Sequence, residues 1–414
     1  MDNLRITGPE TTVNGIVQLP ISKSIANRKL IIESLAGNAE KFPKERLPKD
    51  VEILQNLLIS GKSELNTQHA GTAYRFLLAY LSIQEGVFVL DGSPRMRKRP
   101  IGILVESLNK LGADIQYLGE RGYPPLRING KKLHSKGDPI TLRADVSSQY
   151  ISALMMIAPY IEGGLELHLE GKVLSAPYIQ MTANLMHKAG VEVFFEKEKI
   201  SIQQKYYSSK INSVERDWSA APYFLSILLL QKGNELFFPE LHLKSSQGDA
   251  VASQWFKDLG LESYQEKSGT RFRYNQKEKP YIFEKNFSDQ PDLVPTFAML
   301  CLASGIKARF TGCDNLNLKE SNRLDVLRET ARKLGAIIYE PNSATELFFD
   351  PPESIIIPED TIFQTLDDHR LAMSYSLLGS LGRSIKIADP SVVGKSFPAF
   401  WEELMKIGFT GNAQ

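Results

Sequence analysis

The sequence is poor in the residues that build disulfide frameworks, metal sites and nucleophilic triads. It has two cysteines, Cys301 and Cys313, and six scattered histidines without HxxxH or CxxC spacing. Two cysteines cannot form a disulfide framework, and scattered histidines do not predict a metal site. We therefore expect no metal and no cofactor. Cys301, inside an apolar run, is expected to be a core residue. The cytoplasm is the default compartment for such a chain.

Long apolar runs and an excess of one charge are also missing. No run approaches the roughly 20 residues needed to cross a bilayer, and 49 basic against 48 acidic residues leave a net charge of +1. These features predict neither a membrane nor a nucleic acid as partner. Any anion binding has to come from local clusters of charge. At 414 residues the chain is too long for one core and predicts two domains.

Glycines at regular intervals indicate where predicted helices end. Six times an apolar helical stretch ends on a glycine that precedes an extended segment, which is the usual helix C-cap pattern. Successive glycines from Gly112 to Gly408 are 70 to 78 residues apart, while Gly61 and Gly112 are 51 apart. Such a period predicts six copies of one α/β unit with a shortened first copy. The glycines are Gly61, Gly112, Gly190, Gly260, Gly335 and Gly408.

Cationic residues recur where loops pass into the predicted helices. Lys23, Ser24 and Arg28 lie at the first such junction, and Ser24 and Arg28 would share a helix face. At the second junction, Arg75 follows Gly71 in the first helical turn. A cation there opposes the helix dipole, so a bound anion explains it better than helix stability does. A solvated surface remains the alternative for each residue taken alone.

The densest basic run, residues 94–100, is open to three interpretations. It reads Pro-Arg-Met-Arg-Lys-Arg-Pro and includes Arg95. It could bind nucleic acid, form a solvated face, or hold a small anion through one or two arginines. Because the run is short and the whole chain is nearly neutral, the small anion is favoured.

The later junctions add caps, carboxylates and further cations. Ser147, Asp217 and Asp289 suit helix N-caps, which leaves Ser148, Gln149 and Asp292 to reach a ligand. Glu320, between Lys319 and Arg323, is either their salt-bridge partner or a carboxylate set for proton transfer. Arg370 and Lys395 place two more cations near the C-terminal end.

Taken together, these segments closely resemble the enolpyruvyl transferases, in particular those that act on shikimate 3-phosphate. Each segment alone is weak evidence, but eight of them occur in the family's order along nearly the whole chain. The segments are 20–24, 70–75, 94–96, 146–149, 175–178, 319–323, 368–370 and 395–398.

This resemblance implies an α/β (α+β) fold of two inverse α/β barrels. Each domain would hold three βαβαββ repeats, which agrees with the six units counted from the glycines. The chain would cross twice, giving an upper domain at 20–214 and a discontinuous lower domain at 1–19 plus 215–414. Because the stretch from Asp50 to His69 is short for the family, at least one strand of the first repeat should be missing.

The implied activity transfers the enolpyruvyl group of phosphoenolpyruvate to the 5-hydroxyl of shikimate 3-phosphate. Phosphate leaves from a tetrahedral intermediate, and Asp292, Glu320 and Lys23 would be catalytic. The residues implied to hold shikimate 3-phosphate are Lys23, Ser24, Arg28, Ser147, Ser148, Gln149, Ser175, Asp292, Asn315 and Lys319. Those implied to hold phosphoenolpyruvate are Lys23, Gly71, Arg95, Gln149, Arg323, Arg370 and Lys395.

Two other functions stay open at this point. One is the sister transferase that uses UDP-N-acetylglucosamine, although the loop around Arg95 lacks that branch's usual cysteine. The other is a non-catalytic anion-binding relative, disabled by the short first repeat. The resemblance further implies a monomer and, because Gly71 is glycine, sensitivity to the inhibitor glyphosate. His69, where the family usually has asparagine, makes that sensitivity uncertain.

Overall fold

The computed structural model describes residues 3–38, 40–135, 137–143, 147–171, 173–340 and 344–413. The chain divides into two compact units. Unit 1 combines Met1–Ser22 with Glu215–Gln414, and unit 2 is Lys23–Val214. Each is described separately below.

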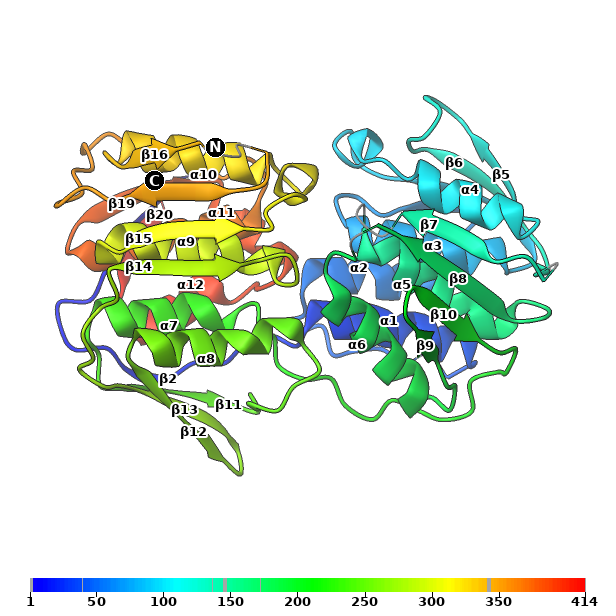
Figure 1. The fold of residues 1–414 in the computed structure, drawn as a ribbon, viewed down its shortest axis with the longest axis horizontal. Helices are drawn as coiled ribbons and strands as arrows, with labels where there is room; N and C mark the ends of the chain where they lie inside the picture. Colours follow the sequence, from blue (N-terminus) through cyan, green and yellow to red (C-terminus); the bar gives the residue numbers. More distant parts are fainter. Residues whose placement is uncertain are drawn as a thin grey trace. The chain divides into compact units, whose positions relative to one another are not determined.

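One supersecondary pattern recurs in both units. A strand, a helix, a second strand and a second helix are followed by two more strands, and the four strands form one sheet (Figure 1). The first two strands pair in parallel, and the fourth pairs antiparallel with the second and with the third. Among the described residues five sheets follow this order, so the βαβαββ repeat expected from the resemblance is confirmed.

Unit 1 contains three complete repeats. The first is β2 (Asn14–Ile16), α7 (Ala221–Leu230), β11 (Glu235–Pro239), α8 (Ala252–Leu259), β12 (Leu261–Glu266) and β13 (Gly269–Tyr274). The second is β14 (Ile282–Asn286), α9 (Val294–Ser304), β15 (Lys307–Thr311), α10 (Arg323–Lys333), β16 (Ile337–Tyr339) and β17 (Leu347–Asp350). The third is β18 (Ile362–Phe363), α11 (His369–Tyr375), β19 (Ser384–Ala388), α12 (Phe400–Lys406), β20 (Thr410–Ala413) and β1 (Asn3–Thr7).

Unit 2 contains two complete repeats and one reduced to helices. The complete repeats are β3 (Glu64–Asn66), α3 (Gly71–Ser82), β4 (Gly86–Asp91), α4 (Gly102–Lys110), β5 (Asp114–Tyr117) and β6 (Leu126–Gly130), then β7 (Ile140–Arg143), α5 (Ser148–Ile157), β8 (Leu165–Glu170), α6 (Ala176–Lys188), β9 (Phe194–Glu196) and β10 (Lys199–Ile202). The reduced repeat keeps only α1 (Lys23–Leu35) and α2 (Lys49–Leu58), with no strand in the described part of residues 23–62. The predicted shortening is confirmed, and it removes the whole sheet.

Short 3-10 turns lead into or follow several helices. They are η1 (Met96–Lys98), η2 (Ala158–Tyr160), η3 (Gly248–Val251), η4 (Pro291–Leu293), η5 (Leu316–Leu318), η6 (Ser376–Leu381) and η7 (Pro390–Lys395). Four of them, η3, η4, η5 and η7, lie between a strand and the following helix in unit 1. These connections carry much of the candidate site.

The six glycines close helices as predicted. Each follows the second helix of its repeat, and all six have positive φ, from 63° at Gly61 to 106° at Gly260. A side chain is strained in this conformation, so glycine ends the helix at little cost.

The first helix of each repeat lies inside its unit. In unit 1, α9 packs against both α7 and α11, and every residue from Val294 to Leu302 is buried. A helix that is apolar on all sides is stable only when it is surrounded by other elements. Helices α1, α3 and α5 pack together in the same way in unit 2. Helices inside and sheets outside are the predicted inverse α/β arrangement (Figure 1).

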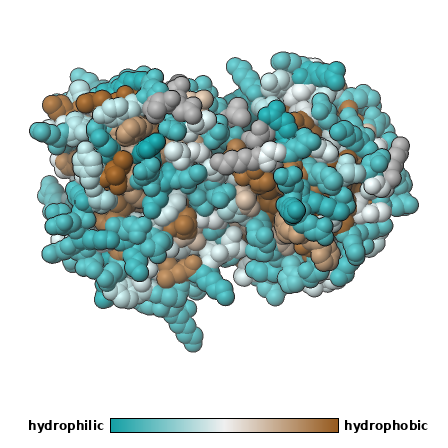
Figure 2. Space-filling model, in the orientation of Figure 1, coloured by the Kyte–Doolittle hydropathy of each residue, from teal (hydrophilic) through white to brown (hydrophobic). Residues whose placement is uncertain are grey.

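Both cysteines belong to the interior of unit 1. Cys301 and Cys313 are buried, and burial raises the pKa of both thiols, that of Cys313 to about 12. Thiolates are therefore disfavoured, and a core role for Cys301 is confirmed. No described helix is long and apolar enough to cross a membrane. Figure 2 shows a largely hydrophilic face with apolar residues in small groups.

Candidate active site

Arg323, the first residue of α10, anchors a cluster of charged side chains in unit 1. Its Nε donates to Asp368 Oδ2 at 2.7 Å, and its Nη2 donates to Asp368 Oδ1 at 3.2 Å and to Glu320 Oε2 at 2.7 Å. Its Nη1 donates to Asp292 Oδ1 at 3.0 Å. The guanidinium is 1% exposed and binds three carboxylates. Its planar fork of donors suits this arrangement.

Asp368 connects the first turn of α11 with the first residue of α10. It is the N-cap of α11, where Oδ1 accepts from the Arg370 amide at 3.0 Å. It is also fully buried against Arg323 and accepts from the Ser321 hydroxyl at 2.9 Å. The cap that starts α11 therefore also fixes the start of α10.

Asp292, in η4 just before α9, collects the remaining cations. Arg370 Nη2 donates to its Oδ2 at 2.7 Å, and Lys319 Nζ lies 3.6 Å from its Oδ1. The unit 1 charge cluster thus balances three cations with three carboxylates. Its members are Lys319, Arg323, Arg370, Asp292, Glu320 and Asp368.

The cluster controls the protonation of Asp292 and Lys319. Burial by itself would raise the pKa of Asp292, but Arg370, Lys319 and Arg323 lower it well below its usual range. Burial lowers the pKa of Lys319, and Asp292 opposes that change only in part. Asp292 is therefore an ionised carboxylate that binds a proton less readily than an ordinary aspartate. Lys319 gives up its proton more readily than an ordinary lysine.

A further carboxyl, Asp249 in η3, lies beside this cluster. It is 2% exposed, its Oδ2 accepts from the Ser219 hydroxyl, and its Oδ1 has no hydrogen-bond partner in the described part of the chain. Burial, together with the charge of Asp292, raises the pKa of Asp249 to about 7. This carboxyl therefore holds a proton over much of the acidic range.

Asp249→Asn should change how stability depends on pH. An unfolded aspartate ionises near pH 4, whereas folded Asp249 ionises at about 7. The folded protein then binds the extra proton, so this group's contribution to the free energy of unfolding is lost as pH rises from about 4 to about 7. In urea unfolding, Asp249→Asn should gain stability relative to wild type between pH 5 and pH 8. Asp258→Asn, an exposed change on α8, is the control; an identical pH response in both variants would refute the prediction.

In unit 2, Arg28 lies inside the helical core and not on the surface. Its Nε donates to the Thr182 hydroxyl at 2.7 Å, Nη1 to the Ser24 carbonyl at 2.8 Å and Nη2 to the Ser152 hydroxyl at 3.0 Å. The side chain is 2% exposed, and burial lowers its pKa to about 10. All of these partners are neutral. The shared face of Ser24 and Arg28 is confirmed, while a solvated Arg28 is wrong because α1 is packed on several sides.

Lys23, the first residue of α1, has an acidic partner that the sequence did not reveal. Its Nζ lies 3.2 Å from Asp50 Oδ2, and Asp50 comes from α2. Both side chains are largely buried. The shortened repeat therefore keeps the two helices that place this pair.

The starts of α3 and α5 bring Gly71 and Gln149 close together. Gln149 Nε2 donates to the hydroxyl of Thr72, the neighbour of Gly71, at 3.2 Å. The Gln149 Oε1 is buried without a partner in the described part of the chain. Ser147 caps α5, its hydroxyl accepting from the Gln149 amide at 3.3 Å, so the predicted capping role is confirmed.

The remaining predicted residues lie at or next to the ends of elements. Ser175 precedes α6 with a left-handed φ of 59°, a conformation that side chains seldom adopt. Lys395, at the end of η7, donates to the Asp367 carbonyl at 2.9 Å, next to the charge cluster. Ser148 begins α5, Arg95 precedes η1 and Asn315 precedes η5.

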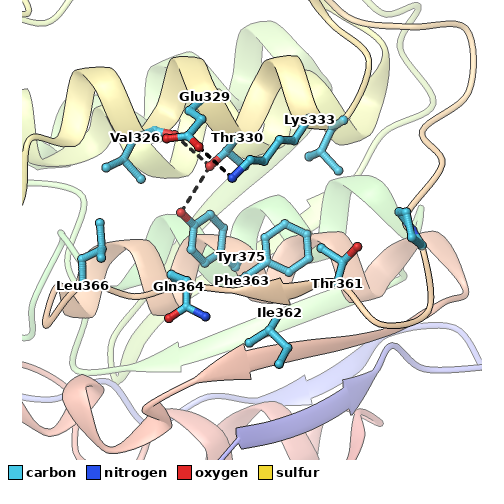
Figure 3. A pocket seen from close by; sticks show the side chains of 12 residues that line it. Val326, Glu329, Thr330, Lys333, Thr361, Ile362, Phe363, Gln364, Leu366 and Tyr375 are labelled. Atoms are coloured by element: carbon cyan, nitrogen blue, oxygen red, sulfur yellow. Dashed lines mark hydrogen bonds and ion pairs between the residues drawn. The ribbon is translucent and has the colours of Figure 1, made fainter.

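A separate cavity of about 430 Å³ lies farther along α10. It is bounded by α10, by β18 with its flanking loops, and by Tyr375 of α11 (Figure 3). The Tyr375 and Thr330 hydroxyls lie 3.4 Å apart at its back, and Lys333 pairs with Glu329 at 2.7 Å. None of the predicted site residues lines this mainly apolar cavity, so it is distinct from the charge cluster.

Comparison with known proteins decides the family. The model for EPSP synthase (3-phosphoshikimate 1-carboxyvinyltransferase) matches residues 45–404. The chain belongs to the EPSP synthase family. A 3-phosphoshikimate 1-carboxyvinyltransferase of Bacteroides fragilis is 37% identical over 398 residues, covering 96% of each chain. One from Colwellia psychrerythraea is 32% identical over 430 residues, covering 96% of this chain and 98% of its own.

Solved structures of EPSP synthase and of a related transferase show the same fold. EPSP synthase from Acinetobacter baumannii has a TM-score of 0.77 at 19% identity, with both chains fully covered. The enolpyruvyl transferase NikO from Streptomyces tendae has a TM-score of 0.73 at 13% identity, covering 100% of this chain and 99% of its own.

The alignment lengths show that members of the EPSP synthase family differ in length. For the same 96% of this chain, the alignment spans 398 positions with the Bacteroides relative and 430 with the Colwellia relative. This chain therefore lacks residues that the Colwellia relative has, and it resembles the Bacteroides relative in length.

Sequence reasoning missed three acidic side chains that lie beside predicted residues within their own units. Asp50 pairs with Lys23, Asp249 lies near Asp292, and Asp368 anchors Arg323, although Asp368 stood within a matched motif. The only signal for Asp368 was its position before a predicted helix, which suggests a cap. No signal pointed to Asp50 or Asp249, because their partners are distant in sequence.

Proposed function

We propose that this chain transfers the enolpyruvyl group of phosphoenolpyruvate to the 5-hydroxyl of shikimate 3-phosphate and releases phosphate. The observation that carries the proposal is the unit 1 charge cluster, where two carboxylates that the resemblance makes catalytic, Asp292 and Glu320, lie among Lys319, Arg323 and Arg370. Anionic substrates are held by such cations, and their proton transfers need carboxylates or amines nearby.

Within this proposal, Asp292 accepts the proton of the 5-hydroxyl as that oxygen attacks C2 of phosphoenolpyruvate. Asp292 is ionised before that step, and the negative charge of the bound substrates raises its pKa toward that of an effective base. Lys319, whose pKa is lowered by burial, and Glu320 are the neighbouring groups suited to move the proton at C3. Loss of phosphate from the tetrahedral intermediate, with transfer of a C3 proton back to one of these groups, then restores the C2–C3 double bond. Arg370 and Arg323 offset the charge that develops.

Unit 2 would supply the contacts to shikimate 3-phosphate. Arg28 is a buried cation whose partners among the described residues are neutral, and this favours an anionic ligand as its counter-charge. Lys23, Ser24, Ser147, Ser148, Gln149 and Ser175 stay assigned to the same ligand through the matched motifs. In unit 1, Asp292, Asn315 and Lys319 complete that set.

Phosphate release by the purified protein tests the proposal. Phosphoenolpyruvate with shikimate 3-phosphate should give stoichiometric phosphate, and phosphoenolpyruvate with UDP-N-acetylglucosamine should give none. Release only with the second acceptor would favour the sister activity. No release with either would favour a non-catalytic anion-binding protein.

Gly71→Ala is expected to raise the inhibition constant of glyphosate by a larger factor than the KM for phosphoenolpyruvate. The φ of Gly71 lies outside the left-handed region, so an alanine causes no backbone strain there, and the melting temperature should change little. Inhibition kinetics and thermal unfolding of both proteins check this. Equal losses of affinity in a folded variant would show that Gly71 does not discriminate between the two ligands.

A monomeric, cytoplasmic protein remains part of the proposal. Light scattering at micromolar concentration measures the first property, and cell fractionation measures the second. A stable dimer or a membrane-bound fraction would contradict them.

A further inference from the structure

Two guanidinium groups converge on the first residue of α3. A methyl group placed on Gly71 would meet Arg75 Nη1 and Arg99 Cζ, each at 2.8 Å, and Arg99 Nη1 at a still shorter distance. Both arginine heads therefore rest on the face of Gly71 where any other residue carries its side chain. Arg99 comes from the basic run that includes Arg95, and Arg75 comes from α3 itself.

Arg75 is fixed and buried at this point. It is 5% exposed, its Nη1 donates to the Gly71 carbonyl at 2.9 Å, and its head lies 5.5 Å from the Tyr150 ring centroid. Its Nε is buried and has no partner in the described part of the chain. Helix α3 has no side-chain cap at its N-terminus, so two cations meet the positive end of a helix dipole. A bound anion would stabilise this arrangement.

We propose that Arg99 is a binding residue for the anionic end of phosphoenolpyruvate at the start of α3, and that Gly71 is glycine because Arg99 rests on it. The inference depends on the proposed function and adds a residue outside the matched motifs. Arg75 holds the Gly71 carbonyl and fixes the backbone, while the head of Arg99, which rests on Gly71, offers its donors to the ligand. A substituent at residue 71 then acts by displacing Arg99.

A double-mutant cycle tests the proposal. The variants are Gly71→Ala, Arg99→Ala and their combination, and Lys98→Ala is the control because it removes an exposed charge from the same run. We expect Arg99→Ala to raise the KM for phosphoenolpyruvate about tenfold or more, as the loss of a hydrogen bond to a charged group would. Lys98→Ala should change it less than about twofold. Because Arg99 is already absent, Gly71→Ala should add little in the Arg99→Ala background.

The proposal is wrong if Gly71→Ala and Arg99→Ala change the KM for phosphoenolpyruvate independently. If Gly71→Ala raises KM by the same factor with and without Arg99, or if Arg99→Ala behaves like Lys98→Ala, then Arg99 does not bind the ligand. Thermal shifts with phosphoenolpyruvate and shikimate 3-phosphate give a readout that needs no turnover. A wild-type protein that shows the shift without phosphate release would refute the proposed function only. A shift that survives in Arg99→Ala would refute the role of Arg99 only.

Discussion

Asp292→Asn and Glu320→Gln should each lower kcat by about 10²- to 10⁴-fold, the range associated with the loss of a general acid or base. Both amides keep the shape of the side chain and an acceptor oxygen, so Arg323 stays attached to Asp368. The KM values should change far less than kcat, because the cations that bind the substrates are retained. Steady-state phosphate release with each substrate varied in turn measures both constants.

The matched control for this experiment is Asp91→Asn. Asp91 pairs with Arg97 in unit 2, so the same chemical change is made at an arginine–aspartate pair outside the cluster. Its kcat should stay near that of wild type. Near-normal turnover in Asp292→Asn and Glu320→Gln would remove both residues from the proton transfers. A loss in Asp91→Asn of the same size would indicate a general effect of the substitution.

Arg323→Gln should destabilise the protein by about 3–5 kcal/mol, the usual cost of breaking a buried ion pair from one side. The reason is Asp368, which is fully buried and would keep its charge without the guanidinium. Asp292 and Glu320 would lose the same partner. Urea unfolding at pH 7 measures the change, and the transition assigned to unit 1 should move to lower urea.

Arg97→Gln is the control for this second prediction. It breaks a pair whose arginine is half exposed, and exposed pairs contribute little to stability. A midpoint close to wild type is expected. If Arg323→Gln proves equally harmless, then Asp368 must be compensated by other groups, and the anchoring role of Arg323 would be wrong.

Contacts could be predicted from the sequence when the interacting residues are close together along the chain. The glycine caps and the cap at Ser147 follow from neighbouring residues, and their positions were predicted correctly. The pairing of Arg323 with Asp368 joins residues 45 positions apart, and Lys23 with Asp50 joins residues 27 apart. No local periodicity specifies such partners, because the packing of whole repeats creates them.

Local sequence patterns also did not predict which charged side chains are buried. A solvated surface was the alternative interpretation for Arg28, because arginine is usually exposed. In the structure, α1 is surrounded by neighbouring helices, so even a cation in its sequence lies in the interior. In unit 1, partial burial and the neighbouring charges together shift the pKa values of Asp292 and Lys319 away from their usual ranges.

The placement of β1 determines the order in which this protein can be completed during synthesis. β1, made first, lies between β19 and β20, pairing Asn3 with Ala388 and Thr7 with Thr410. Unit 2 is a continuous segment and can fold while the ribosome is still translating the rest. Strand β1 must wait, unpaired, until β19 and β20, which begin at Ser384 and Thr410, have emerged. The strand is therefore exposed to mispairing while the residues between Thr7 and Ser384 are being translated.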